Sequence, residues 1–249
     1  MGAGTMALEH KHTAEAIRQR LAGGSRPNYA RDFVYGGIDG AVTTFAIVAG
    51  VVGASLSASI VIVLGLANLL ADGLSMAASN YSGTKTEVDE FKQLRAMEHR
   101  HIAVDPDGER EEIRQIMALK GLQGETLEQA VEAITADRER WVATMLFEEH
   151  GQSGILRDPV KSALSTFAAF VVCGAVPLLP YLALPADSAM SVALIMTSIV
   201  FFAIGSLKSQ WSLTRWWISG LETLIIGLAA ASAAFAIGYL LRDLVGGAA

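Results

Sequence analysis

Residues 60–83 decide the fold: they read IVIVLGLANLLADGLSMAASNYSG and set polar side chains into an otherwise apolar run. A run of this length spans the hydrocarbon core of a bilayer, which takes about 20 apolar residues. An ionisable group at membrane depth costs about 2.5–3.5 kcal/mol on insertion scales, so it is expected to face a bundle interior or a water-filled path. The polar and sulfur-bearing residues recur at steps of four and share one helix face; they are Asn68, Asp72, Met76 and Asn80.

The preceding apolar stretch, 33–55, carries a second carboxylate, Asp39, within the run GGIDG of residues 36–40. Asp72 and Met76 are one helical turn apart, so both can contact one ion. A carboxylate with a thioether suits a divalent transition metal better than Ca²⁺ or Mg²⁺, which prefer oxygen ligands. The alternative is that neighbouring helices satisfy the polar groups and that Met76 is ordinary packing.

Long apolar stretches predict an all-α membrane protein with five transmembrane helices. These stretches cover approximately 33–55, 59–83, 162–183, 188–208 and 219–241. No proline lies between Ile60 and His101, so the second helix is expected to continue beyond the membrane. Glycines in the first two stretches are expected to let helix backbones approach closely; they are Gly36, Gly40, Gly50, Gly53, Gly65 and Gly73.

The charge of the chain is concentrated in one segment. Hydrophobic residues make up 52% of the chain and its net charge is −6. Residues 84–161 hold 17 acidic and 11 basic residues, which accounts for that net charge. The acidity disfavours nucleic acid as a partner and favours cations. Because Cys173 is the single cysteine, a disulfide within the chain is excluded.

The basic residues predict how the chain crosses the membrane. We expect an N-terminal segment at 1–31, two spans at 32–83, a helical insert at 84–160 and three spans at 161–249. The positive-inside rule places the N-terminus and the insert in the cytoplasm and the C-terminus outside. No signal peptide is recognised, which suits a bacterial inner membrane. The basic residues before the first span are Lys11, Arg18, Arg20, Arg26 and Arg31.

The insert is predicted to form three helices. The first continues the second span over 85–102. The second covers 105–121 and begins with an Asp-Pro pair, an N-cap followed by proline at the first helical position. The third covers 126–151 and begins with a Thr–Gln capping box. A further short helix is expected over 14–21.

The insert also carries potential metal ligands in pairs, each pair three residues apart and therefore on one helix face. Carboxylate, imidazole and thioether groups together describe a transition-metal site, with iron, manganese, cobalt and zinc as candidates. Paired glutamates on bundled helices build di-metal carboxylate sites. A solvated acidic face is the commoner alternative for such a pattern. The pairs are Glu98 and His101, Glu109 and Glu112, and Met145 and Glu148.

Enzyme signatures are absent from the sequence. It has no phosphate-binding Gly-Lys-Ser/Thr loop, which argues against an ATP-driven pump. It also has no His-Glu-x-x-His run and no hydrolase-type arrangement of serine, cysteine and histidine. We therefore expect a protein that is not an enzyme.

Several motifs resemble the vacuolar iron transporter family: DFVYGGIDG at 32–40, TTFA at 43–46, ADGLSMA at 71–77 and KTE at 85–87. The chain is expected to be a bacterial-type member of this family. The resemblance runs from about residue 30 to the end and includes the order of two spans, a cytoplasmic helical insert and three spans. It implies a homodimer of five-span subunits that moves Fe²⁺, and often Mn²⁺, out of the cytoplasm in exchange for protons. It also implies a transport path at the dimer interface, between the first two spans.

The resemblance also implies roles for individual residues. Asp39 matches the family's first-span aspartate, and Met76 matches its second-span methionine. The second-span glutamate of the family falls at Asn68, a departure for which Asp72 can supply the charge. The implied transport path is Asp39, Asp72, Met76 and Asn68. The implied metal ligands of the insert are Glu98, His101, Glu109, Glu112, Met145 and Glu148, with His101 standing where a glutamate is usual.

We therefore expect a proton-coupled exporter of Fe²⁺ that also takes Mn²⁺, Co²⁺ or Zn²⁺ and holds no prosthetic group. Three alternatives stay open. One is a membrane metal sensor or buffer that binds metal without moving it, and the second is a membrane ferroxidase built on the insert. The third is a channel, which would show no proton coupling.

Overall fold

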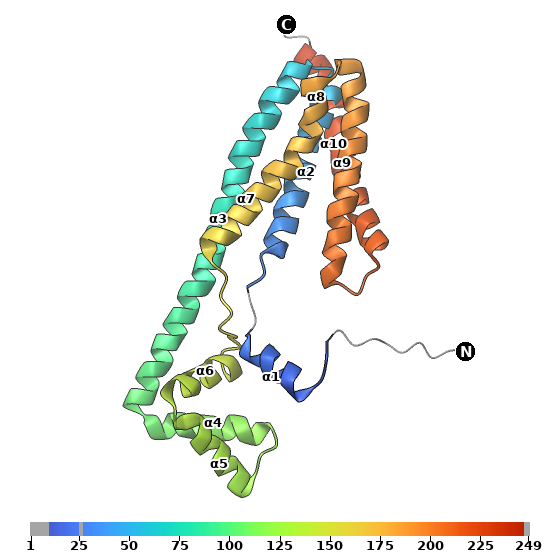
Figure 1. The fold of residues 1–249 in the computed structure, drawn as a ribbon. Coiled ribbons are helices and arrows are strands. Elements are labelled where there is room, and N and C mark those ends of the chain that lie inside the picture. The colour runs from blue at the N-terminus through green and yellow to red at the C-terminus, as the bar shows by residue number, and fades with distance from the viewer. Residues whose placement is uncertain (1–9, 25–26, 247–249) are drawn as a thin grey trace, which may run out of the picture. The chain divides into compact units, whose positions relative to one another are not determined.

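The computed structural model describes residues 10–24 and 27–246, and this part of the chain contains helices and turns but no strand (Figure 1). The chain divides into two compact units. Of the described residues, 28–100 and 157–246 form one, called here the membrane unit. Residues 10–24, 27 and 101–156 form the other, the insert unit. The predicted all-α class is confirmed. Arg26 lies outside the described residues.

Five helical segments of the described chain are long and apolar enough to cross a membrane. This confirms the prediction of five spans, although the helices run further than the apolar stretches because they continue into polar residues at their ends. The segments are α2 (Ala30–Gly53), α3 (Ala58–Val104), α7 with α8 (Pro159–Ala183), α9 (Ala186–Lys208) and α10 (Trp216–Gly246).

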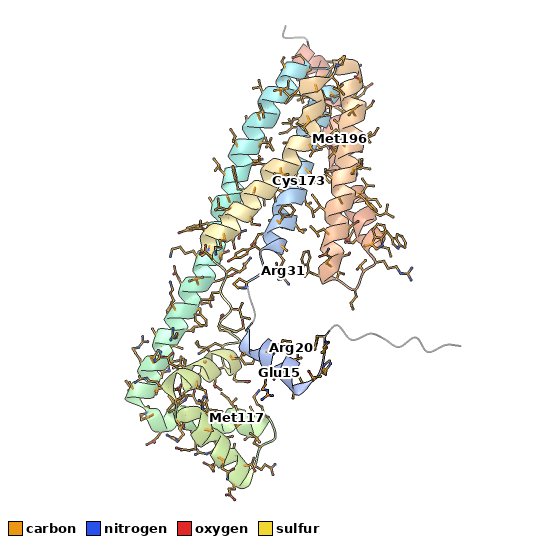
Figure 2. The ribbon with its side chains drawn as sticks, viewed as in Figure 1. Glu15, Arg20, Arg31, Met117, Cys173 and Met196 are labelled. Carbon is orange, nitrogen blue, oxygen red and sulfur yellow. The ribbon has the colours of Figure 1, made fainter. Side chains whose placement is uncertain are left out.

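The third span, predicted over about 162–183, is interrupted by a short 3₁₀ turn. It consists of α7 (Pro159–Ala175), a 3₁₀ turn (Val176–Leu178) and α8 (Leu179–Ala183). Two prolines, Pro177 and Pro180, lie in this region, and proline cannot donate the backbone hydrogen bond that continues a helix. Cys173, the single cysteine, is buried in α7 just before the interruption (Figure 2).

Helix α2 packs against α7, α9 and α10 within the membrane unit. A Cβ atom at Gly36 or Gly40 would collide with the α7 backbone, at Thr166 and Phe170 respectively. A Cβ atom at Gly53 would collide with the α10 backbone in the same way. The predicted role of these glycines is therefore confirmed, since each permits backbone contact between helices.

Helix α3 is one unbroken helix of 47 residues, as the absence of proline predicted. Its glycines meet side chains rather than backbone: Gly65 lies against Leu178, and Gly73 lies against the rings of Phe167 and Phe170. Because the apolar surface of α3 is largely exposed in the single chain, it is available to lipid or to another helix. The exposed apolar side chains are Val63, Leu64, Leu66, Leu70 and Leu74.

The insert unit contains α1 (Ala14–Ala22), α4 (Pro106–Leu119), α5 (Gly124–Thr135) and α6 (Arg138–Glu148). Both the short N-terminal helix and the start of α4 lie where the sequence predicted them. Asp105 caps α4, because its Oδ1 accepts a hydrogen bond from the backbone nitrogen of Gly108 at 3.0 Å. The helices bury apolar side chains that include Ile113, Val131, Trp141 and Met145.

The predicted third helix of the insert, 126–151, is wrong in extent because the chain forms two helices there. Asp137 is extended and its Oδ1 accepts a hydrogen bond from the backbone nitrogen of Arg140 at 2.8 Å, so it caps a new helix, α6. The predicted capping box is also wrong. Helix α5 begins at Gly124, and Gln129 donates its side-chain hydrogen bond to Glu125 at 3.1 Å.

Gly40→Ala is expected to lower the melting temperature of the protein in detergent. The added methyl group would overlap the α7 backbone, and overpacking a close-packed interior costs about 1–3 kcal/mol. Gly83→Ala is the matched control, because a Cβ atom there meets nothing within 4 Å and alanine favours a helix. Equal losses of stability in the two variants would contradict the close contact between α2 and α7.

The insert unit is expected to lose stability in acid through Arg114. This residue ion-pairs with Glu111, and its Nε donates to Glu128 Oε1 at 2.8 Å; these bonds hold the pKa of both carboxyls below their usual range. A lowered pKa stabilises the fold above the unfolded value of about 4.3, and that stability is lost as the pH falls through the folded pKa. The melting temperature of Arg114→Gln should therefore fall less than that of wild type on acidification from about pH 6 to about pH 3. Equal decreases in the melting temperatures of the two proteins over this pH range would contradict the prediction.

Candidate functional site

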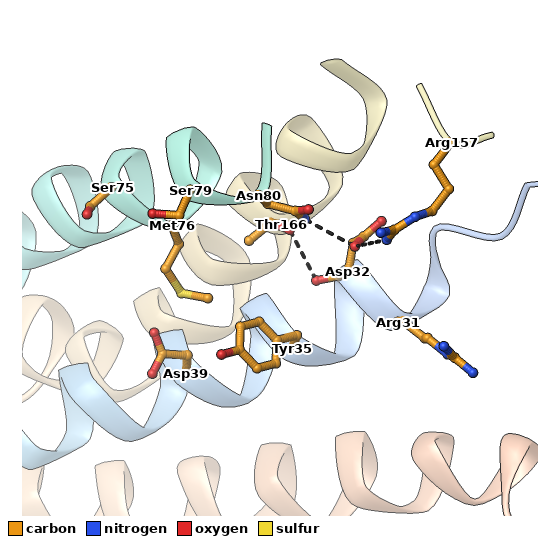
Figure 3. A pocket seen from close by; sticks show the side chains of 10 residues that line it. All are labelled: Arg31, Asp32, Tyr35, Asp39, Ser75, Met76, Ser79, Asn80, Arg157 and Thr166. Atoms are coloured by element: carbon orange, nitrogen blue, oxygen red, sulfur yellow. Dashed lines mark hydrogen bonds and ion pairs between the residues drawn. The ribbon is translucent and has the colours of Figure 1, made fainter. Parts of the chain in front are cut away.

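A pocket of about 590 Å³ lies in the membrane unit between α2, α3 and the start of α7 (Figure 3). Asp39 of α2 and Met76 of α3, two residues of the predicted transport path, line it together. The side chain of Met76 points toward Asp39 across the pocket (Figure 3). The full lining is Arg31, Asp32, Tyr35, Asp39, Ser75, Met76, Ser79, Asn80, Arg157 and Thr166.

The other two residues of the predicted path, Asn68 and Asp72, lie outside this lining. Asn68 is joined to the Asp39 turn through Thr43. Its Nδ2 donates to Thr43 Oγ1 at 3.4 Å, and Thr43 Oγ1 donates to the carbonyl oxygen of Asp39 at 2.8 Å. Asp72 is exposed in the single chain and stands on α3 one turn before Met76. A carboxylate so placed in a membrane helix requires water or another helix beside it.

Asn80, the last of the four residues at steps of four on α3, joins three helices at the wall of the pocket. Its Nδ2 donates to Thr166 Oγ1 of α7 at 2.6 Å and to Asp32 Oδ1 of α2 at 3.1 Å. Its Oδ1 accepts a hydrogen bond from Thr84 Oγ1 at 3.1 Å. Figure 3 shows Asn80 and Thr166 beside Asp32. The amide therefore holds α2, α3 and α7 in a fixed relation around the pocket.

An ion pair of Asp32 and Arg157, which the sequence did not predict, lies at the same wall of the pocket. Arg157 Nη1 lies 3.0 Å from Asp32 Oδ1, and Arg157 Nη2 lies 3.2 Å from Glu87 Oε2. The side chain of Asp32 is nearly buried. Its place in the motif at 32–40 was a usable signal. No sequence signal identified Arg157. Its partner in α2 is 125 residues away, and Arg157 lies in the segment that was assigned to the insert.

In the insert unit, two of the predicted metal ligands meet. His101 Nδ1 lies 3.3 Å from Glu109 Oε1, where the glutamate side chain is 7% exposed and the histidine 49% exposed. Glu98 precedes His101 by one turn on the continuous α3 and is itself buried. An imidazole beside a nearly buried carboxylate is the ligand chemistry of a transition-metal site.

The remaining predicted ligands are placed differently. Met145 is fully buried among the core side chains of the insert unit. Glu112 is exposed on α4, one turn beyond Glu109. Glu148 Oε2 lies 2.8 Å from Lys120 Nζ, so a lysine already neutralises this carboxylate. A metal at Glu148 would have to displace that lysine.

Comparison with known proteins decides the family. The sequence model of the VIT family matches residues 30–239. The chain belongs to the VIT family. The vacuolar iron transporter 1 of Oryza sativa subsp. japonica is 31% identical over 231 residues, covering 92% of this chain and 90% of the relative. The vacuolar iron transporter 1 of Arabidopsis thaliana is 31% identical over 216 residues (85% and 86%), and the vacuolar iron transporter of Toxoplasma gondii is 31% identical over 230 residues (88% and 76%).

Membership of the VIT family confirms the resemblance read from the motifs. The names of these relatives describe transporters, in agreement with the expectation that the chain is not an enzyme. The expectation of a bacterial-type member is not confirmed, because these relatives come from plants and from Toxoplasma gondii. The apolar helices of this VIT-family chain are those of a multi-pass membrane protein.

Asn80→Ala is expected to destabilise the membrane unit by about 1–3 kcal/mol, the usual cost of leaving a buried polar partner unsatisfied. The substitution removes donors from Asp32 and Thr166 together. Thermal unfolding in detergent measures the loss. Ser75→Ala is the control, because Ser75 lines the same pocket without a hydrogen bond among the described residues. A melting temperature of Asn80→Ala equal to that of the control would show that the network does not hold the helices.

Proposed function

We propose that this VIT-family chain exports Fe²⁺, and other divalent transition metals such as Mn²⁺, from the cytoplasm in exchange for protons. The observation that carries the proposal is the position of Asp39 and Met76, which line one pocket from facing membrane helices. The iron transport named for the relatives supports iron as the cargo.

The ligand chemistry of the pocket supports a transition metal over Ca²⁺ or Mg²⁺. Asp39 offers a charged oxygen and Met76 a polarisable sulfur. Ca²⁺ and Mg²⁺, which prefer oxygen ligands, do not use this combination. The hydroxyl of Ser75 lines the same pocket and adds a neutral oxygen ligand. In this proposal the ion keeps water at its other positions and passes along α3.

The carboxylates of the proposed path support proton coupling. A carboxylate binds metal only when it is deprotonated, so proton and metal compete for the same oxygen. Protons that arrive from the side opposite the cytoplasm would release the metal there. Asp39 and Asp72 are the groups proposed to carry out this exchange, since both are carboxylates in membrane helices.

A second copy of the chain would complete the path. Asp72 is exposed in the single chain, on a helix whose apolar face is also exposed. A lipid-facing carboxylate is unfavourable, so a partner α3 is the better neighbour for Asp72. We therefore propose a homodimer formed through the first two spans, α2 and α3, with the path along the seam.

The insert is proposed to capture metal on the cytoplasmic side. The predicted ligands there are Glu98, His101, Glu109, Glu112, Met145 and Glu148, and the contact of His101 with Glu109 supports the proposal. An imidazole in this set extends the expected cargo to Co²⁺ and Zn²⁺ and makes capture sensitive to pH near neutrality.

The orientation and the membrane are part of the proposal. Basic residues before α2 and within the insert support a cytoplasmic N-terminus and insert. The bacterial inner membrane expected from the sequence stays a prediction, whereas the names of the relatives refer to a vacuole. A non-transporting sensor or buffer is the rival function; a ferroxidase is disfavoured because the family is one of transporters.

Transport by purified protein in liposomes tests the proposal. Wild type is expected to accumulate Fe²⁺ when the lumen is acidic, and to accumulate little without a pH gradient. Asp39→Ala should lower the initial rate at least about 10–100-fold, the range seen when groups that support a metal are removed. Glu109→Ala should raise the half-saturating Fe²⁺ concentration while leaving the maximal rate nearly unchanged, because it acts on capture.

Glu125→Ala is the matched control for the insert, since Glu125 is an exposed acidic residue bonded to Gln129. It is expected to transport like wild type. Transport by Asp39→Ala at the wild-type rate would contradict the assignment of the path. Metal binding without any flux would favour the sensor, and flux that ignores the pH gradient would favour the channel.

A further inference from the structure

Asp32 is a buried carboxylate whose hydrogen-bonding capacity is only half used. The residue is 6% exposed, and its Oδ1 accepts from Asn80 and Arg157. Its Oδ2 is buried and has no hydrogen-bond partner among the described residues. Leaving one oxygen of a buried carboxylate unsatisfied is costly, so this site retains capacity for a better-matched cation. Asp32 lines the pocket that also holds Asp39 (Figure 3).

Arg157 supplies the positive charge that now balances Asp32. Its Nη1 lies 3.0 Å from Asp32 Oδ1, and its Nη2 lies 3.3 and 3.2 Å from the two carboxylate oxygens of Glu87. A guanidinium does not lose its proton in proteins, so it behaves as a permanently bound monovalent cation. Its side chain is 28% exposed, and it can therefore leave Asp32 for water.

The backbone beside Arg157 is anchored, so its side chain can move alone. The backbone nitrogen of Asp158 donates to Tyr29 Oη at 3.0 Å. Asp158 also caps α7, because its Oδ1 accepts from the backbone nitrogen of Lys161 at 2.9 Å. Releasing the guanidinium from Asp32 therefore does not require α7 to unwind.

We infer that Arg157 is a tethered counterion that competes with the transported divalent cation for Asp32 at the pocket. This inference rests on the proposed function and adds a specificity-determining residue to it. A divalent cation carries twice the charge of the guanidinium and can use both oxygens of Asp32. A monovalent alkali ion has no such advantage, so the competition favours divalent cargo over Na⁺ and K⁺.

Arg31 provides a matched comparison for Arg157. It lines the same pocket and carries the same charge, but it forms no ion pair among the described residues. Arg31→Gln therefore removes a positive charge from the pocket without releasing Asp32. A difference between Arg157→Gln and Arg31→Gln reports the competition itself rather than a change in the general electrostatic field.

The test measures how Mn²⁺ protects a thiol in the pocket of the purified full-length protein. Ser79→Cys places the thiol on the lining, and the buried Cys173 of the unsubstituted chain gives the background. The rate of labelling by a trimethylammonium methanethiosulfonate reagent is measured at increasing Mn²⁺ concentrations and constant ionic strength. The Mn²⁺ concentration that halves this rate is the half-protecting concentration. If Arg157 holds Asp32 about nine-tenths of the time, its removal lowers that concentration about tenfold. Arg31→Gln should change it about twofold or less, as a screened surface charge.

Asp32→Asn completes the comparison. Once Asp32 is neutral, adding Arg157→Gln is expected to cause no further change in protection. The inference is overturned if Arg157→Gln and Arg31→Gln give equal shifts, if the Arg157→Gln shift persists in Asp32→Asn, or if Mn²⁺ protects no variant. Melting temperatures check folding, and if Arg157→Gln fails to fold, Arg157→Lys serves in its place with a smaller shift in the same direction.

The outcomes separate this inference from the proposed function. If Mn²⁺ protection of the thiol depends on Arg157 but the protein moves no metal in liposomes, the competition for Asp32 is supported and transport is refuted. If metal flux depends on Asp39 but thiol protection is the same with and without Arg157, transport is supported and the tethered counterion is refuted.

Discussion

The close backbone contact between α2 and α7 is the constraint on which the pocket depends. Gly36 and Gly40 have no side chains where the two helices meet, so α7 lies directly against α2. Thr166, whose carbonyl faces Gly36, also accepts the hydrogen bond of Asn80. Any side chain at position 36 would displace Thr166 and, with it, the link to α3. The glycines therefore determine where the polar side chains of Thr166 and Asn80 lie, although glycine itself has no side chain.

Much of this arrangement was predictable because membrane helices have strong sequence signals. Length and apolar content predicted five spans, and the absence of proline predicted the long α3. The periodicity of α3 also placed Met76 on the face that meets Asp39. The break between α5 and α6 was harder to predict, because the apolar period continues past Asp137 and hides its capping role. Local patterns show which residues share a helix face, but they do not show where a short helix stops.

Pairings between distant residues were the part that could not be predicted. Asp32 and Arg157 are separated by 125 residues, and neither stands in a periodic pattern that includes the other. The pairing of Glu148 with Lys120 was missed for the same reason. In both cases a basic side chain of the protein occupies a carboxylate that a metal could use. Acidic residues alone therefore overstate how much ligand is free for cargo.

The exposure of Asp72 has a consequence for how much working protein a membrane contains. If a second copy of the chain must cover this carboxylate, the working form is a pair, and pairs form by mass action. At low density the number of pairs rises with the square of the number of chains. A cell that makes half as much of the chain would then lose more than half of its flux, so its metal tolerance would respond steeply to gene dosage.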